Sequence, residues 1–537
     1  MANIAFRVRD VKRRIELSKF SRLMSEMGFE TDIGKDEVNV DITPHRPELL
    51  DFDMLMWALE VFDGRAKPSK TDYIPINERL IDIEVSKSVS GIRPFIMGVA
   101  AKRVDLSGRK ADYLIRFIEK ISETYGRKRS RIAIGIHDLS KISGNILRYE
   151  ALSESSFVPL DSEYSMSFDD IIRRHQKGIE YGGLVPSGKY PVLRDSDKIM
   201  AFIPIVNSDA TKVSSGTDSL FIDVTGTDAV GVRNVTEIMN CVLRHMGADV
   251  YKVRVHVGKR STTSPSGVWR RLSLKESRIS SILGIEDLGS TAVHVRRCGY
   301  VASSSKGILT VYIPPYRTDI IGSMDIIEDV AIGYGYNRIK PVPVSGHFVG
   351  IPERSVPLYE RVTRLFIGIG FTEAMNNYLT DEESQFHNMG RADNGKSVRV
   401  EYAKTSSISI LRQSLIPMLM QNLSDSMNEP MPQRLFEYGK VFVRVPGSVY
   451  ERDSLAFVAV HSKANFGEAK SVFDVIAREM GLDLAVVRYE DPAFIKGRCA
   501  GISDNGKIIG VFGEIHPTVL NRFKIDEPVI AGEIYLE

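Results

Sequence analysis

Three stretches rich in glycine, proline, serine and charge divide this chain, and they constrain its architecture more than any other sequence feature. They span residues 64–73 (GRAKPSKTDY), 258–267 (GKRSTTSPSG) and 337–357 (NRIKPVPVSGHFVGIPERSVP). This composition is typical of turns and exposed connections. The 537 residues correspond to roughly three or four domains at about 150 residues each, so we interpret the stretches as linkers between four parts. The sequence has no fixed-period repeat, which argues against a solenoid or a propeller.

Each of the four parts mixes helical and strand periodicity. In the first part, apolar residues at helical spacing (Phe20, Leu23, Met24 and Met27) precede an alternating segment over 37–42. The irregular order of helices and strands favours a multidomain α+β fold over one doubly wound sheet. The remaining predicted elements are strands over 131–136, 220–224 and 308–313 and helices over 114–121, 235–246, 325–334 and 358–369.

Composition and charge narrow the class of protein. Hydrophobic residues make up 43% of the chain and charged residues 26%, which is close to the average for folded domains. The 71 basic and 69 acidic residues leave a net charge of +2, so the chain is not a uniformly basic nucleic-acid binder. Any contact with RNA is therefore expected to be local.

Signals for export or membrane insertion are missing from the sequence. Charged residues interrupt the first eleven positions, and the longest apolar run, 199–206, contains Pro204 and falls far short of the roughly 20 residues of a membrane span. We therefore expect a cytoplasmic protein without a membrane partner. The three scattered cysteines are expected to be buried thiols; they are Cys241, Cys298 and Cys499.

Common catalytic motifs are also missing. Residues 183–189 match the phosphate-loop pattern GxxxxGK, but Tyr190 replaces the Ser or Thr that would hold magnesium. Pro186 and Pro191 disfavour the helix that the loop requires. The ten histidines form no HExxH motif, and there is no GxSxG elbow, so the sequence gives no support to zinc-protease or serine-hydrolase chemistry.

An acidic cluster follows the apolar strand of the third part. The spacing of Asp325, Glu328 and Asp329 places three carboxylates on one face of a predicted helix, and Asp319 is close enough in sequence to join them. Carboxylate oxygens are ligands that suit Mg²⁺. A solvated helix face, whose acids favour the N-terminal end of the helix dipole, would show the same pattern. The spacing leaves both interpretations open.

A basic run precedes the strand at 131–136. Four cations within five residues could contact phosphate groups of RNA. Runs of charge are more commonly solvated faces, and that interpretation also stays open. The four cations are Arg127, Lys128, Arg129 and Arg131.

Five longer motifs, spread in order over essentially the whole chain, carry a family resemblance. The first is DITPHRPELL at 41–50, in which His45 stands where the family usually has asparagine. The others are the series GRKRSRIAIGIHD, KGIEYGGLVPSGKYPVL, PIVNSDATKV and LFIDVTGTD, then PPYRTDIIGSMDIIEDVAIGYGYNRIKP, SSISILRQSLIPMLMQNLSDSMNEPMPQRLFEYGKVF and GVFGEIHPTVLNRF. Together they resemble the β subunit of phenylalanyl-tRNA synthetase in its archaeal and eukaryotic cytosolic form.

The resemblance implies a domain series and a partner. We expect an N-terminal α+β domain (1–75), an α/β editing domain (76–262), a small winged-helix-like domain with the acidic helix (263–340), and a class II synthetase-like domain with an antiparallel sheet (350–537). In the last domain, the spacing of Arg434 and Glu437 departs from the arginine motif with which class II enzymes bind ATP. The chain is then expected to lack its own aminoacylation site. It would join a catalytic α subunit in an (αβ)₂ heterotetramer, which attaches L-phenylalanine to tRNA-Phe with ATP.

The resemblance also implies two sites. One is a Mg²⁺ site shared with the α subunit, with Asp319, Asp325, Glu328 and Asp329 at the family's ligand positions. The other is an editing pocket that hydrolyses Tyr-tRNA, useful because an apolar pocket rejects an added hydroxyl by only about a hundredfold. Its candidates lie at the ends of apolar strands, although turn chemistry would also explain two of them, Asn207 and Asp223. The candidates are Asn207, Ser208, Asp223 and Thr225.

Two other functions are compatible with the sequence. One is a free-standing aminoacyl-tRNA deacylase, and the other is a non-enzymatic RNA-binding scaffold whose editing pocket is inactive.

Overall fold

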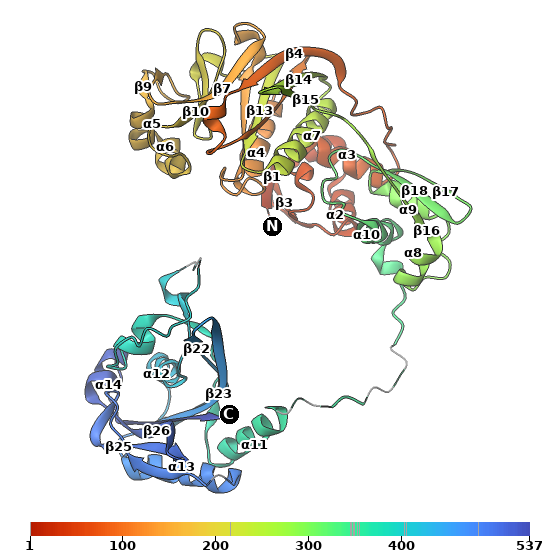
Figure 1. The fold of residues 1–537 in the computed structure, drawn as a ribbon. Coiled ribbons are helices and arrows are strands. Elements are labelled where there is room, and N and C mark those ends of the chain that lie inside the picture. The colour runs from red at the N-terminus through yellow and green to blue at the C-terminus, as the bar shows by residue number, and fades with distance from the viewer. Residues whose placement is uncertain are drawn as a thin grey trace. The chain divides into compact units, whose positions relative to one another are not determined.

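The chain divides into two compact units, Met1–Pro343 and Val344–Glu537 (Figure 1). The computed structural model describes residues 2–214, 216–343, 346, 349–351, 353, 355–401, 403, 405–481 and 483–536. The boundary between the units falls inside the third predicted linker, 337–357. Both units combine sheets with helices, which confirms the prediction of a multidomain α+β fold.

The first unit begins with a small antiparallel sheet covered by helices. Strand order is β1-β3-β2, and the predicted alternation is confirmed because Val38, Val40 and Ile42 of β3 are buried. Helix α2 buries Phe20, Leu23 and Met24, as its spacing predicts. The elements are β1 (Ala2–Arg7), α1 (Val8–Arg14), α2 (Leu17–Glu26), β2 (Glu30–Ile33), β3 (Glu37–Ile42), the 3₁₀ turn η1 (Pro47–Leu50) and α3 (Phe52–Phe62).

A mixed ten-stranded sheet forms the centre of this unit, in the order β12-β11-β10-β7-β4-β14-β5-β13-β6, with β15 paired to β14. Strand β4 runs parallel to both β14 and β7, and the other pairs are antiparallel. The strands are β4 (Ile76–Val85), β5 (Phe95–Lys102), β6 (Ile132–Asp138), β7 (Ile146–Leu152), β10 (Tyr190–Arg194), β11 (Ile199–Phe202), β12 (Val206–Asn207), β13 (Ser219–Gly226), β14 (Asp249–Val257) and β15 (Arg260–Ser264).

Two long helices, α4 (Lys110–Glu123) and α7 (Ala229–His245), pack against this sheet near β6, β5 and β13 (Figure 1). On β13, Leu220, Ile222 and Val224 join the hydrophobic core that contains both helices. The intervening residues therefore face away from this core, because side chains alternate along a strand. A separate small core surrounds β8 (Ser156–Phe157), β9 (Met166–Ser167), α5 (Phe168–Arg174) and α6 (Gln176–Tyr181).

Helix α7 holds the first two predicted linkers in place, so they are not loose connections. The side chain of Asn240 donates to the carbonyl of Tyr73 (2.9 Å), and His245 Nε2 lies 2.9 Å from the Tyr73 hydroxyl. The carboxylate of Glu237 accepts hydrogen bonds from the backbone N–H groups of Ser266 and Gly267 (2.7 and 3.0 Å). The second stretch also contains β15, a strand of the central sheet. The prediction of a linker at 258–267 was therefore wrong, because its polar composition belongs to a β-hairpin.

The last part of the first unit has a three-stranded sheet, in the order β16-β18-β17, and three helices. It shares a continuous hydrophobic core with the N-terminal part and with helices α4 and α7. Its elements are β16 (Arg270–Lys275), α8 (Glu276–Leu283), α9 (Thr291–Arg297), β17 (Val301–Ser305), β18 (Ile308–Ile313) and α10 (Ser323–Tyr334). Its description as winged-helix-like stays a prediction.

The second unit contains a seven-stranded sheet in the order β19-β22-β23-β27-β26-β25-β24, antiparallel except for the short β19–β22 pair. Two hydrophobic cores pack against it. The strands are β19 (Thr372–Glu373), β22 (Gln433–Val445), β23 (Ser448–Val460), β24 (Ala485–Arg488), β25 (Phe494–Asp504), β26 (Lys507–Ile515) and β27 (Val529–Leu536), with a separate pair β20 (Leu379–Thr380) and β21 (Ile410–Leu411). The helices are α11 (Ser355–Gly368), the π-helix η7 (Glu383–His387), α12 (Ile416–Asp425), α13 (Phe466–Met480) and α14 (Pro517–Phe523).

Across the described residues, no helix combines the length and apolar character that a membrane span requires.

Candidate functional site

A pocket of about 330 Å³ lies where the two edge strands of the ten-stranded sheet approach each other. Strands β12 and β6 stand at opposite ends of the strand order, yet the side chain of Asn207 on β12 donates to the carbonyl of Ile136 on β6 (3.1 Å). The sheet must therefore curl on itself, as strongly twisted sheets do. Asn207, Asp223 and Thr225 all line this pocket, together with apolar residues such as Phe202.

Asp223 is the buried carboxylate of the pocket. It lies in the middle of β13, and its register partners on both neighbouring strands are glycines, Gly98 and Gly135. Its Oδ2 lies 3.1 Å from Nε2 of His137, whose Nδ1 lies 2.8 Å from the hydroxyl of Thr211. His137 is fully buried, so this chain of contacts holds the carboxylate in one orientation.

Thr225 is held by a buried arginine that the sequence reasoning missed. Arg93 donates from Nε to the Thr225 hydroxyl (3.1 Å) and from Nη2 to the Thr225 carbonyl (2.8 Å). Burial lowers the pKa of Arg93 to about 10, and the nearby Asp223 acts in the opposite direction. The guanidinium therefore stays charged at neutral pH and adds a fixed positive charge next to the pocket. An isolated arginine before a strand carries no motif that could have revealed it.

The strand-end interpretation of the four editing candidates holds only in part. Asn207 does end β12, but Asp223 is mid-strand, so turn chemistry does not explain it. Ser208 does not line the pocket; its hydroxyl accepts from the N–H of Ala210 at the start of the 3₁₀ turn η5 (Asp209–Thr211) and donates to the carbonyl of Val158. The side chain of Ser208 points away because successive residues of an extended segment alternate in direction.

The basic run adopts an unusual backbone conformation. Arg127, Lys128 and Arg129 have consecutive positive φ angles of 49°, 51° and 64°, which disfavours each L-residue by roughly 1–2 kcal/mol. Backbone hydrogen bonds hold the turn, among them Lys128 N–H to Glu123 O (2.8 Å) and Arg129 N–H to Ser122 O (2.9 Å). The turn sends neighbouring cations in different directions.

Two of the four cations are already engaged. Arg129 lines the pocket, donates to the carbonyl of Ile205 (2.7 Å) and stacks over the ring of Tyr181. Arg131 donates twice to Oδ2 of Asp228, at 2.9 and 2.6 Å. Arg127 and Lys128 are exposed, and their side chains pair with no acid in the part of the chain that the structure describes. Of the four cations in the basic run, Arg127 and Lys128 are therefore the two that are available to a phosphate.

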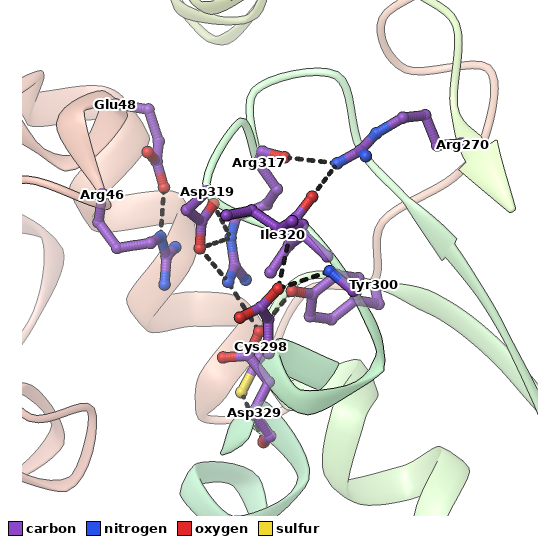
Figure 2. A network of polar contacts seen from close by, with 12 residues as sticks. Arg46, Glu48, Arg270, Cys298, Tyr300, Arg317, Asp319, Ile320 and Asp329 are labelled. Atoms are coloured by element: carbon purple, nitrogen blue, oxygen red, sulfur yellow. Dashed lines mark hydrogen bonds and ion pairs between the residues drawn. The ribbon is translucent and has the colours of Figure 1, made fainter. Parts of the chain in front are cut away.

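The acidic cluster is part of a buried ionic network (Figure 2). Nη2 of Arg317 donates to Asp319 and to Asp329, each at 2.7 Å, and the hydroxyl of Tyr300 donates to Asp329 as well. Burial alone would raise the pKa of Asp319, but the guanidinium of Arg317 holds it below its usual value. Arg46 pairs with Glu48 (2.6 Å) beside this group, which brings the N-terminal part into the network.

The structure does not gather the four predicted Mg²⁺ ligands. Asp329 is buried against Arg317, so Asp325, Glu328 and Asp329 do not share one exposed edge as predicted. The carboxylate of Asp325 accepts the backbone N–H groups of Ile321 and Gly322 (2.6 and 2.7 Å), and Glu328 faces solvent. Among the described residues, no group of three or more His, Cys, Asp or Glu side chains is arranged to hold a metal ion. In this chain alone, Arg317 therefore neutralises two of the four carboxylates, and the site shared with the α subunit stays a prediction.

Arg434 and Glu437 of the second unit, whose spacing departs from the arginine motif of class II enzymes, both form ion pairs with other side chains of this unit. Arg434 pairs with Glu468 (3.0 Å), and Glu437 pairs with the buried Arg412 (2.5 Å). Both side chains thus serve internal ion pairs.

Three family models match the chain. Their descriptions are the B3/4 domain at 109–242, the tRNA synthetase B5 domain at 272–336, and the phenylalanyl tRNA synthetase beta chain CLM domain at 342–536. This series defines the class of protein as a subunit of a class II aminoacyl-tRNA synthetase.

Curated relatives extend the match over nearly the whole chain. Phenylalanine–tRNA ligase beta subunits are 36% identical in Archaeoglobus fulgidus (93% of this chain, 91% of the relative) and 32% identical in Methanocella arvoryzae (97% and 96%). A solved N-terminal fragment of the phenylalanyl-tRNA synthetase β-subunit from Pyrococcus horikoshii is similar with a TM-score of 0.58 and 26% identity, over 62% of this chain and 99% of the fragment. The chain belongs to the family of phenylalanine–tRNA ligase beta subunits.

Proposed function

We propose that this chain works with a catalytic α subunit in an (αβ)₂ heterotetramer, in which the α subunit binds ATP and L-phenylalanine and charges tRNA-Phe. Family membership supports this assignment, and the internal ion pairs of Arg434 and Glu437 agree with the absence of synthesis on this chain. Co-expression with the α subunit and a mass measurement test the partner and the stoichiometry together. Robust phenylalanine-dependent ATP–pyrophosphate exchange by the chain alone would contradict the assignment.

We further propose that the first-unit pocket hydrolyses tyrosine from mischarged tRNA-Phe. The observation that carries this proposal is the convergence of Asn207, Asp223 and Thr225 on one pocket of about 330 Å³ with partly apolar walls. The apolar side chains suit the aromatic ring, and the buried polar groups suit a phenolic hydroxyl. An analogue without that hydroxyl lacks these hydrogen bonds, which disfavours phenylalanine.

The reaction is the hydrolysis of an ester. Water adds to the carbonyl carbon of the aminoacyl group, the bond from that carbon to the ribose oxygen breaks, and the ribose hydroxyl regains a proton. The products are tyrosine and uncharged tRNA. His137 acts as a positioning residue, because it contacts Asp223 from the side buried in the protein. Arg127 and Lys128 are the proposed phosphate contacts for the RNA that delivers the ester.

The test of the editing site is deacylation of Tyr-tRNA by the assembled enzyme. Asp223→Asn should slow hydrolysis by about tenfold or more, since positioned polar groups contribute at least that much to such reactions. Asp209→Asn is the matched control, because Asp209 lies exposed on the adjacent η5. An unchanged rate for Asp223→Asn would refute the proposed pocket.

The same assay separates the two other functions. A free-standing deacylase would hydrolyse Tyr-tRNA at full rate without the α subunit. An assembly scaffold would leave Tyr-tRNA intact even in the wild-type complex.

A further inference from the structure

A second cavity, of about 360 Å³, lies in the second unit and has no role in editing. It is bounded by η7, by the loops around 391–396 and 413–414, and by strands β22, β23 and β27. Its volume falls in the range of about 300–1,000 Å³ that is usual for small-ligand sites.

The lining of this cavity carries more positive than negative charge, because only one of its three cations, Arg391, is paired with an acid. Three cations, Arg391, Lys396 and Arg452, line it, and no carboxylate does. Two acids close to the cavity, Asp491 and Glu533, already accept hydrogen bonds from other groups of the protein. Asp491 accepts two hydrogen bonds from Arg391 (3.1 and 2.9 Å), and Glu533 accepts from the N–H of Leu415 (2.9 Å) and from two serine hydroxyls.

Arg452 is the least satisfied of the three cations. Its guanidinium lies 3.3 Å from the ring centroid of Tyr535, which fixes its position, but its Nε is buried and has no hydrogen-bond partner. Within the described residues, Arg452 makes no ion pair with an acid. A half-buried guanidinium that lines a cavity and has no acidic partner suits a negatively charged ligand, because charge-assisted hydrogen bonds are the strongest available to it.

Aromatic side chains complete the site. Phe386, Tyr450 and Tyr535 line the same cavity as the cations, and Tyr450 is 46% exposed, so its ring is accessible to a ligand. Aromatic rings next to arginine suit a ligand that carries both a flat ring and a phosphate.

We propose that this cavity binds a small ligand of the mononucleotide class, with its phosphate on Arg452 and Lys396 and its base against Tyr450. This inference is independent of the editing proposal, since it concerns a different cavity in the other unit.

Calorimetric titration of the full 537-residue chain with AMP tests the proposal, with adenosine and inorganic phosphate as separate probes. We expect AMP to bind more tightly than either probe. Arg452→Met keeps a side chain that packs on Tyr535 but removes the charge, and should weaken AMP binding by ~tenfold or more. Lys396→Met, at an exposed position where folding is not at risk, should weaken it as well.

Two controls locate the signal. Arg488→Met removes an exposed arginine from β24, at the other edge of the same sheet, and should leave AMP binding unchanged. Asp223→Ala should also leave it unchanged, which separates this cavity from the first-unit pocket. The proposal is overturned if AMP does not bind, if both Arg452→Met and Lys396→Met bind it like the wild type, or if phosphate alone binds as tightly as AMP.

Discussion

Asp223 fits its place in the pocket because the residue beside it on β6 has no side chain. A Cβ added to Gly135 would lie 2.1 Å from Oδ2 of Asp223 and 3.2 Å from Nε2 of His137. Atoms at the first distance overlap, so the carboxylate would have to move. The requirement is local, because Gly135 has an ordinary negative φ and is constrained only by this close approach.

Gly135→Ala is therefore expected to lower the rate of Tyr-tRNA hydrolysis by about tenfold or more, since a shift of this size displaces a positioned group. The overpacking should also reduce the free energy of unfolding by about 1–3 kcal/mol. Gly183→Ala is the control, because a Cβ there meets nothing within 4 Å. Deacylation assays and urea unfolding measure the two effects, and wild-type hydrolysis by Gly135→Ala would argue against the role of Asp223.

The left-handed turn at 127–129 decides which cations are available for RNA. Replacing both Arg127 and Lys128 by Gln is expected to weaken tRNA binding and to reduce the slope of log K against log salt by about 1–2, one phosphate contact for each lost charge. Lys259 and Arg260, an exposed basic pair in the β14–β15 hairpin, provide the matched double substitution. Equal slopes for the two double variants would show that the turn does not contact phosphate.

At the scale of elements, Arg317 joins α10 to the segments packed around it. Its guanidinium bonds carboxylates on α10 and on the preceding loop, and its backbone carbonyl accepts from Arg270 on β16 (3.3 Å). The ionic network around Arg317 lies between the three-stranded sheet, α10 and the 3₁₀ turn η1 (Figure 2). A residue with this many partners from different elements is expected to stabilise their relative arrangement.

Arg317→Met should lower the free energy of unfolding by about 3–5 kcal/mol, because it leaves Asp319 and Asp329 buried without a counter-charge. Arg278→Met removes an exposed arginine on α8 and should change it by less than about 0.5 kcal/mol. Urea unfolding of the two variants gives the comparison. Similar stabilities for both would mean that solvent or a bound ion compensates the two carboxylates.

At the scale of the first unit, one aromatic cluster lies where its three parts meet. Trp57 on α3 lies 4.6 Å from the ring of His245 on α7, and Tyr73 stacks with Trp269 at 5.8 Å between centroids. These are the only two tryptophans in the sequence, so tryptophan fluorescence reports on this junction alone. Burial lowers the pKa of His245 from 6.5 to about 4.

The junction should therefore weaken in acid. Below pH 6.5 the unfolded chain binds a proton at His245 while the folded chain does not, so stability is lost as the pH falls from about 6.5 towards 4. Relative to pH 7.5, we expect a loss of about 2 kcal/mol at pH 5 from this group. Urea unfolding followed by tryptophan fluorescence gives the free energy of unfolding at each pH. The difference between the wild type and His245→Gln in this pH dependence is the contribution of His245.

Much of the fold and part of the site were predictable from local pattern. The alternating segment 37–42 matches β3, because every second residue of a strand lies on its buried face, and the strand predicted over 308–313 matches β18. Asn207, Asp223 and Thr225, assigned through the family resemblance, do line one pocket. The family resemblance likewise came from the sequence alone, and the curated relatives confirm the family.

What only the tertiary structure decided are the relations between distant segments. Spacing puts Asp329 on one helix face with Asp325 and Glu328, but in the folded unit Asp329 is buried against Arg317 and Tyr300 and belongs to no exposed acidic cluster. The hydrogen bond from Arg93 to Thr225 joins residues that are far apart in the sequence, and the contact between β12 and β6 forms because the sheet curls. Periodicity specifies which face of an element is buried, whereas the partner across that face is set by the packing of the whole unit.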